Sequence, residues 1–215
     1  MSKLINQLKD LYPEVDYQAL MAQMQNQSHP RRKLKELQEK GFLIRLKKGF
    51  YVLTYDFIGK NYSPQIIANL LYGPSYLSLE YALSYYSLIP ERVEVLTSVT
   101  TQKNKTFDTQ VGHFSFTHLA SAIYPIGVSI ESTQDNRFFI IATPEKALMD
   151  IFSLRYKNSD SPKSQDIQRI LTDDLRIDLD IFEKNMNRKL LQEMLPLYKN
   201  RIWNQRVIKY LLENL

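Results

Sequence analysis

Apolar residues near the start of the chain recur at the three- and four-residue intervals of amphipathic helices. Pro13 ends the first predicted helix, because the residue before a proline is pushed out of the helical region. Asp16 is the expected N-cap of a second helix, and the polar run 25–27 follows as a turn. The apolar positions are Leu4, Leu8 and Leu11 in the first helix and Tyr17, Leu20, Met21 and Met24 in the second.

A third helix is predicted to begin near Ser28-His29-Pro30 and to stop at Gly41. Ser28 or His29 can cap its start, where Pro30 supplies a fixed φ for the first turn. Gly41 tolerates the left-handed conformation that commonly closes a helix. Only two interior residues of this helix are apolar, so it buries a thin stripe and leaves the rest of its surface to solvent.

Two strands are predicted directly after this helix, over residues 42–46 and 50–53. Lys47-Lys48-Gly49 lies between them, which predicts a β-hairpin with a lysine-tipped turn. Two helices, a basic third helix and a hairpin follow one another in the order of a winged helix-turn-helix.

Beyond Pro64 the periodicity alternates between helix and strand. A helix over 65–72 and a second one after Ser78 precede a β-branched, alternating stretch. Thr143-Pro144-Glu145 opens a further helix with a cap, a proline and an acid in the first turn. The strands predicted between these helices cover residues 93–98, 105–109, 113–117 and 137–142.

The last fifty residues are helical in pattern, after a polar loop over 158–164. The whole chain is therefore predicted to be α+β, with a winged helix-turn-helix over residues 1–60. Residues 61–215 are predicted to form a larger domain with a small antiparallel sheet, flanking helices and a helical C-terminus.

The positive charge of the chain is confined to its first quarter. Residues 1–60 hold eleven Lys and Arg against six Asp and Glu, a balance of +5, whereas residues 61–215 hold seventeen of each. This asymmetry predicts an anion-binding module joined to a neutral domain.

Double-stranded DNA is the anion that the winged helix-turn-helix pattern favours. Arg31, Arg32 and Lys35 would enter the major groove, since Arg and Lys donate to guanine O6 and N7. The start of the third helix would meet phosphate, and the two wing lysines would reach phosphate or the minor groove. The predicted DNA-binding residues are Ser28, His29, Arg31, Arg32, Lys35, Lys47 and Lys48. The alternative is an ordinary solvated helix, which the i, i+4 pairs Lys35–Glu39 and Glu36–Lys40 also fit.

Enzymatic and metal chemistry have little support in the sequence. The chain has no cysteine, and its three histidines show no metal-ligand spacing, so no metal and no cofactor are expected. Glu145, Lys146 and Asp150 invite comparison with a nuclease. The acid and the lysine are adjacent at a helix start, however, so the helix dipole and an i, i+4 ion pair explain them, and we expect no enzyme.

No apolar run approaches the length of a membrane span, and no signal peptide is apparent. We therefore expect a cytoplasmic protein without a membrane partner. The fourteen tyrosines leave a protein-interaction surface open as a further interpretation.

Three blocks of the sequence resemble the AbiEi family of bacterial antitoxins. They are KLKELQEKGFLIRLKKGFYVL at 33–53, SYLSLEYALSYYSLIPERVEVLTSVTTQKNKTFDTQVGHFSFTHL at 75–119, and ATPEKALMDI at 142–151. The resemblance implies a winged helix that represses the protein's own operon by binding inverted repeats, with Arg31, Arg32, Lys35, Lys47 and Lys48 as its contacts. It also implies an antitoxin domain, a nucleotidyltransferase toxin encoded by a neighbouring gene, and a role in phage defence. A plain winged-helix transcription regulator with a ligand-sensing or dimerisation domain is the alternative.

Overall fold

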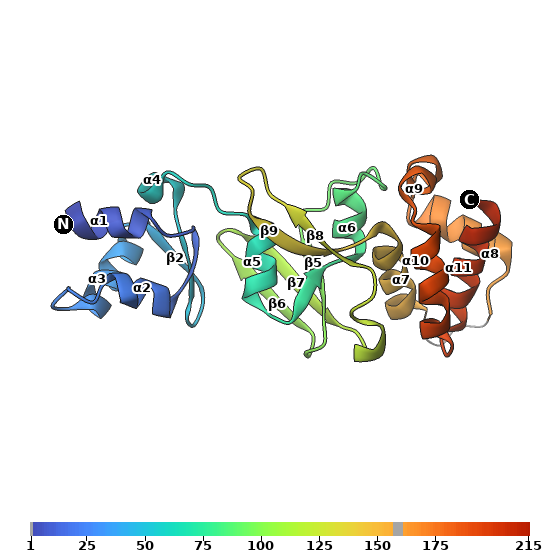
Figure 1. The fold of residues 1–215 in the computed structure, drawn as a ribbon, viewed down its shortest axis with the longest axis horizontal. Helices are drawn as coiled ribbons and strands as arrows, with labels where there is room; N and C mark the ends of the chain where they lie inside the picture. Colours follow the sequence, from blue (N-terminus) through green and yellow to red (C-terminus); the bar gives the residue numbers. More distant parts are fainter. Residues whose placement is uncertain (1, 157–160) are drawn as a thin grey trace.

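The computed structural model describes residues 2–156 and 161–215, and it is α+β, as expected from the sequence. The described part of the chain forms an elongated molecule with three regions in a row (Figure 1). The N-terminal helices lie at one end, a six-stranded sheet lies in the middle, and the C-terminal helices lie at the other end. No described helix combines the length and the apolar character that crossing a bilayer requires.

The first region has the element order of a winged helix-turn-helix. Its strands form a three-stranded antiparallel sheet in the order β1-β3-β2. The helices are α1 (Ser2–Lys9), α2 (Tyr17–Gln23) and α3 (Pro30–Glu39), and the strands are β1 (Glu14–Asp16), β2 (Leu43–Lys47) and β3 (Phe50–Leu53). The predicted cap of the second helix is confirmed, since the Asp16 side chain accepts a hydrogen bond from the Ala19 amide at 2.7 Å.

The first helix is shorter than predicted, and the strand β1 was not foreseen. The helix ends at Lys9 rather than at Tyr12, because the chain must straighten to pair Glu14 with Val52 of β3. Pro13 lies in the extended segment that follows the helix, and its carbonyl accepts a hydrogen bond from the Leu53 amide at 2.8 Å.

The middle region contains one mixed sheet in the order β6-β7-β5-β4-β9-β8. Its strands are β4 (Ser75–Leu77), β5 (Leu96–Thr100), β6 (Lys105–Thr109), β7 (Gly112–His118), β8 (Val128–Ser132) and β9 (Phe138–Ala142). The expectation of a small antiparallel sheet here is corrected: β5 pairs with β7 and β4 pairs with β9 in parallel. The sequence pattern missed β4 and β8 and placed the first predicted strand too early, because strand partners far apart in the chain decide which residues extend.

The helices α4 (Tyr55–Ile58), α5 (Pro64–Leu71), α6 (Leu79–Tyr85) and α7 (Pro144–Arg155) connect or cover the sheet. The C-terminal helices are α8 (Ser164–Arg169), α9 (Leu179–Asn185), α10 (Arg188–Met194) and α11 (Ile202–Asn214), with a π-helical turn after α8. The helical C-terminus is confirmed, whereas the start of the polar loop predicted over 158–164 falls outside the described residues.

The central strand of the winged helix, β3, is buried on both faces. Leu43, Tyr51 and Leu53 belong to the apolar core beneath α1, α2 and α3. Phe50 and Val52 belong instead to the core of the larger domain. The two regions are therefore packed together through apolar side chains and do not simply follow one another on a linker.

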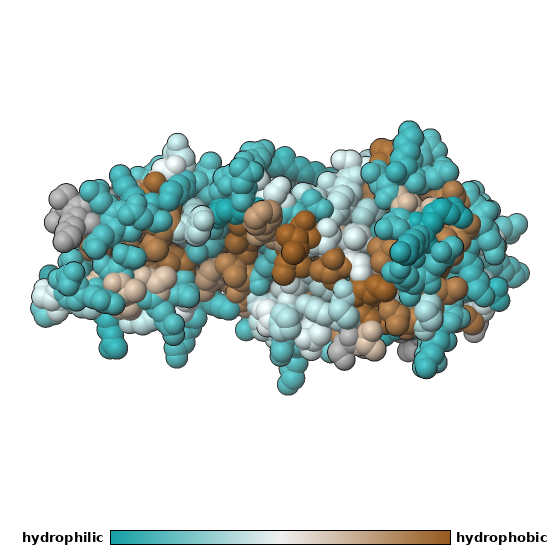
Figure 2. All heavy atoms as spheres, viewed as in Figure 1, coloured by the Kyte–Doolittle hydropathy of each residue, from teal (hydrophilic) through white to brown (hydrophobic). Residues whose placement is uncertain are grey.

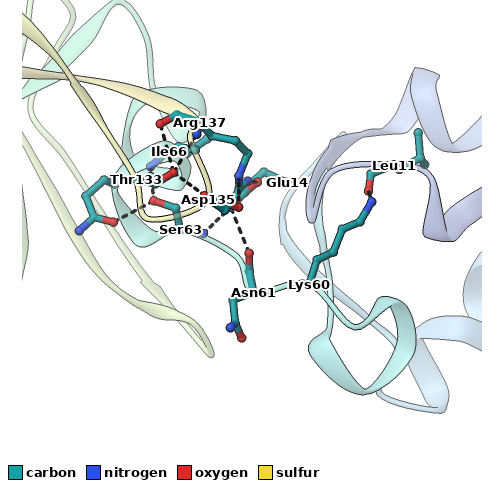
Figure 3. Close-up of polar contacts among 10 residues, drawn as sticks. Leu11, Glu14, Lys60, Asn61, Ser63, Ile66, Thr133, Asp135 and Arg137 are labelled. Atoms are coloured by element: carbon teal, nitrogen blue, oxygen red, sulfur yellow. Dashed lines mark hydrogen bonds and ion pairs between the residues drawn. The ribbon is translucent and has the colours of Figure 1, made fainter.

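An ion pair reinforces this junction (Figure 3). Arg137, in the turn of the β8–β9 hairpin, pairs with Glu14 of β1, and both side chains are largely buried, with 12% and 1% of their surface exposed. The second oxygen of Glu14 accepts a hydrogen bond from the Ser63 amide at 2.6 Å. Arg137 also donates a hydrogen bond to the Asn61 carbonyl at 3.0 Å, and Lys60 Nζ donates one to the Leu11 carbonyl at 3.1 Å.

Candidate nucleic-acid interface

The helix α3 is held to the N-terminal core by a narrow apolar stripe. Leu34 and Leu37 are buried in the same cluster as Leu8, Leu20 and Met24. The opposite face of α3 is open to solvent at the end of the molecule away from the larger domain (Figure 1). The geometry leaves this face free to approach another large molecule.

Three basic side chains occupy the open face of α3. Arg31, Arg32 and Lys35 are all exposed, as the sequence predicted. Arg32 lies 3.4 Å from Glu36 and Lys35 lies 3.6 Å from Glu39, while Arg31 is in no ion pair among the described residues. Exposed pairs of this kind contribute little to stability, so a phosphate or a base edge can replace the carboxylates at small cost.

Glu36 pairs on this helix with Arg32 and Lys33, and no ion pair with Lys40 forms. The hydrogen bond from Lys33 Nζ, at 3.0 Å, lowers the pKa of Glu36 below its ordinary value, and the charges of Lys33, Arg32 and Lys40 add to this effect. Glu36 is therefore ionised at neutral pH and competes with any anion for Arg32.

The start of α3 is also accessible. Ser28 and His29 are exposed, and the His29 side chain makes no capping hydrogen bond. Residues 28–32 line a surface depression of about 460 Å³. The first amides of the helix thus lack a side-chain cap and lie beside two arginines, an arrangement that suits a phosphate oxygen.

The wing is the turn between β2 and β3. Lys48 is exposed in this turn, as predicted, and Gly49 has φ +83°, which a residue with a side chain rarely adopts. The Gly49 carbonyl accepts a hydrogen bond from the Tyr17 amide at 2.9 Å. This bond ties the wing to the start of α2 and fixes the position of Lys48 relative to the helices.

Lys47 differs from the other predicted DNA-binding residues. Its ammonium group donates to the carbonyl of Leu71, at the C-terminal end of α5, at 2.5 Å. Its side chain is half-buried, and desolvation lowers its pKa, to which the charge of Lys105 adds. The structure thus engages Lys47 at the domain junction and leaves Lys48 as the exposed lysine of the pair.

Arg45 is an exposed basic residue outside the set of predicted DNA-binding residues. It is exposed on β2 and lies on the same side of that strand as Leu43, which faces the helices. Its Nε lies 3.4 Å from the Lys47 carbonyl. The signal was present in the sequence, because the period of two along 43–47 places Arg45 on the face opposite Ile44 and Leu46.

The acidic residues considered for a nuclease are buried in the larger domain. The i, i+4 pair of Lys146 and Asp150 is confirmed at 2.6 Å, but both side chains are fully buried. Asp150 also accepts hydrogen bonds from Tyr76 at 2.9 Å and from Ser78 at 2.8 Å, and Glu145 accepts one from the Asn187 amide. No group of three His, Asp or Glu side chains suited to a metal ion occurs in residues 2–156 and 161–215.

Comparison with protein-family models gives no match for this sequence, and comparison with curated proteins gives none either. Among solved structures, the crystal structure of the RV2827C protein from Mycobacterium tuberculosis is similar, with a TM-score of 0.62 and 14% sequence identity. The similarity covers 99% of this chain and 75% of the mycobacterial one, so it includes the described parts of both domains. At this level of identity the likeness concerns the fold alone.

Proposed function

We propose that the chain binds double-stranded DNA through α3 and represses transcription. The observation that carries this proposal is the exposed basic face of α3, with Arg31, Arg32 and Lys35 on an anchored helix at the free end of a winged helix-turn-helix. Two arginines and a lysine at the N-terminal half of the second helix of such a motif suit base edges in the major groove. Lys48 and Arg45 would contact the phosphate backbone beside that groove.

The repressor is proposed to be the antitoxin of an AbiE-like two-gene system that controls its own operon. This part rests on the three sequence blocks that resemble the AbiEi family, and the partner would be a nucleotidyltransferase toxin encoded next to it. Residues 61–215 would carry the antitoxin activity. The protein would act as a DNA-binding and interaction protein in the cytoplasm, without a catalytic step of its own.

A regulator that senses a small molecule is the second candidate. A depression of about 740 Å³ lies between the linker 59–65 and the β8–β9 hairpin, next to Arg137. A ligand bound there would act on the contact between the two domains. Such a regulator would show operator affinity that changes with a small molecule, and its neighbouring gene would be harmless to the cell.

DNA binding is tested by titrating the full chain onto labelled DNA from upstream of its gene at several salt concentrations. Affinity should fall steeply with salt, because each neutralised phosphate releases counterions. Arg31→Ala and Arg32→Ala should each weaken specific binding by about 5- to 150-fold, as expected for loss of a bidentate base contact of about 1–3 kcal/mol. Unchanged affinity in both variants would overturn the recognition-helix assignment.

Lys35→Ala has a matched control in Lys189→Ala. Both lysines are exposed and both form i, i+4 pairs with glutamate, at 3.6 Å and 3.9 Å, but Lys189 lies on α10 at the other end of the molecule. Only Lys35→Ala should weaken DNA binding. An equal loss in both variants would indicate a non-specific effect of net charge.

Antitoxicity is tested by growth of cells that express the neighbouring gene with the full chain or with the Arg31→Ala/Arg32→Ala variant. The full-length variant is preferable to a fragment of residues 61–215, because removal of the first domain would expose the apolar surface that Phe50 and Val52 cover. Rescue by the variant would separate antitoxicity from repression. If the neighbouring gene is harmless, or if even the unaltered chain does not rescue, the antitoxin proposal falls.

A further inference from the structure

The strand β8 is an open edge of the six-stranded sheet, since β9 is its only partner among the described strands. The Gly127 carbonyl and the Thr133 amide, at either end of β8, are hydrogen-bonded toward β9 at 2.8 Å and 2.7 Å. Backbone groups alternate in direction along an antiparallel strand. Val128, Ile130 and Ser132 therefore turn their N–H and C=O groups away from β9, to the open edge.

The side chains beside this edge form an exposed apolar patch. Ile130 pairs directly with Ile140, and Ser132 pairs with Phe138, so these residues share one face of the hairpin. Ile130 is 68% exposed, Phe138 67% and Ile140 41%. Leu70 of α5, 52% exposed, is the next residue after Asn69, whose side chain is hydrogen-bonded to the backbone of Ile140. Figure 2 shows apolar side chains gathered over the middle of the molecule, where β8 and β9 lie.

The sequence of β8 lacks the features that usually protect an edge strand. Natural edges carry lysines, prolines or bulges that prevent pairing with another chain. Residues 128–132 contain none of these, and the one charged residue, Glu131, lies on the opposite face with the Tyr86 hydroxyl at 3.5 Å. The other edge strand, β6, begins with Lys105 and also carries Asp108.

We propose that β8 pairs with β8 of a second copy of this chain, antiparallel and across a two-fold axis at Ile130. The strand is its own complement in this arrangement: Ile130 would lie opposite its copy, and Val128 opposite Ser132 of the partner. The outward backbone groups of both strands would bond to each other, and the two sheets would join into one. The apolar patches of the two copies would lie side by side on one face.

A second copy fits this surface better than a charged partner does. The patch presents no charged side chain for a partner to match, and a two-fold pairing buries the same residues on both sides. The four exposed side chains present on the order of 400 Å² per copy, the size of the largest apolar patch on a typical monomer, which is often functional. Pairing the sheets edge to edge leaves most of both patches on the open face and covers chiefly the two β8 strands. The interface is therefore smaller than the roughly 1,200 Å² of stable specific complexes, and the dimer should be weak and dependent on concentration.

Single cysteines test the register, because the chain has none of its own. The variants are Ile130→Cys, Val128→Cys and Ser132→Cys, each in the full chain and oxidised with copper phenanthroline in the absence of DNA. Ile130→Cys should form a covalent dimer by itself. Val128→Cys and Ser132→Cys should each remain monomeric alone and should form a covalent dimer when mixed, because only the mixture places two cysteines opposite each other.

Leu197→Cys is the control, since Leu197 is 44% exposed and belongs to the turn Leu195–Tyr198 of the C-terminal helical region and not to the sheet. It should stay monomeric under the same conditions. Equal cross-linking of Leu197→Cys and Ile130→Cys, or no cross-linking of Ile130→Cys, overturns the proposal. If Val128→Cys alone forms covalent dimers as readily as its mixture with Ser132→Cys does, the two-fold register is wrong.

Sedimentation velocity gives an independent readout without any cysteine. The unaltered chain should shift from monomer toward dimer as its concentration rises, and Ile130→Lys should abolish the shift while its thermal melting is unchanged. A chain that stays monomeric up to high micromolar concentration overturns the proposal, as does a dimer that Ile130→Lys leaves intact. Neither result depends on DNA, so failure here leaves the proposed repressor function standing.

Discussion

Removal of the Arg137 guanidinium is the perturbation that tests how firmly the two domains are joined. Arg137→Met retains the apolar part of the side chain and deletes the ion pair with Glu14 and the hydrogen bonds to Asn61 and Asp135. Glu14 would then keep one partner, the Ser63 amide, in a site where 1% of its side chain is exposed. A carboxylate left buried without its cation is costly.

The size of the effect follows from this burial. Breaking a buried ion pair by removal of one partner costs about 3–5 kcal/mol of unfolding free energy. Because the Ser63 amide still satisfies one oxygen of Glu14, we expect about 3 kcal/mol for Arg137→Met, at the lower end of that range. Glu14→Gln keeps an acceptor for Ser63 and should cost less. The double variant should lose about 1–2 kcal/mol less than the sum of the two, since the second change removes a group that the first has already left unpaired.

The assay is urea unfolding of the full chain, followed by circular dichroism. Arg176→Met is the matched control, because Arg176 pairs with Glu91 at 2.5 Å but both side chains are well exposed, at 61% and 44%. That variant should lose less than about 1 kcal/mol. An Arg137→Met variant within about 0.5 kcal/mol of the unaltered chain, in the range of ordinary surface substitutions, would refute the view that this ion pair stabilises the junction.

Three further predictions concern stability. Gly127→Ala should lower the unfolding free energy by more than about 1 kcal/mol in a urea titration, because φ is +73° there and an added Cβ would lie 2.8 Å from Lys146 Cβ; an unchanged midpoint would contradict this. Asp150→Ala should lower the unfolding free energy by about 3–5 kcal/mol, since it leaves the buried Lys146 ammonium without its carboxylate. A loss below about 1 kcal/mol in the same titration would show that the ion pair is dispensable. The pKa of Asp135 lies below its ordinary value, first through the hydrogen bond from Thr133 and then through the neighbouring guanidinium. Its contribution to stability is therefore complete above the unfolded-state pKa and is lost as pH falls through the lower folded value. Asp135→Asn should consequently reduce the loss of stability on acidification, and identical pH profiles of unfolding free energy would exclude this.

The junction also bears on how the protein would work. Phe50 and Val52 on β3 are part of the larger domain's core, while Tyr51 between them is part of the winged-helix core. One strand thus contributes to both cores, so a displacement of the larger domain would move the wing. If the chain is a repressor, this contact is a direct route by which an event in residues 61–215 could alter DNA binding.

The winged helix was largely predictable from the sequence because its signals are local. Helical spacing, the Asp16 cap, the Pro30 start and the hairpin with its glycine each depend on residues a few positions apart. The exposed basic residues of α3 followed from the same reasoning, since Leu34 and Leu37 identify the buried side of the helix and leave Arg31, Arg32 and Lys35 on the other side. The spacing of the apolar residues along one amphipathic helix or strand determines which of its faces is buried.

The tertiary structure decided the features that depend on distant partners. It showed the strands β4 and β8: the three residues of β4 extend between β5 and β9, and the five residues of β8 extend along β9. It separated Lys47 from Lys48: the two are adjacent in sequence, but only the first meets the end of a helix 24 residues further along the chain. It also joined Glu14 to Arg137, 123 residues apart, and placed the Lys146–Asp150 pair in the core, although its i, i+4 spacing resembles that of a surface pair. Spacing along the chain determines which residues share a face, but burial and the choice of partner depend on what packs against that face, and that is settled only when the whole chain is folded.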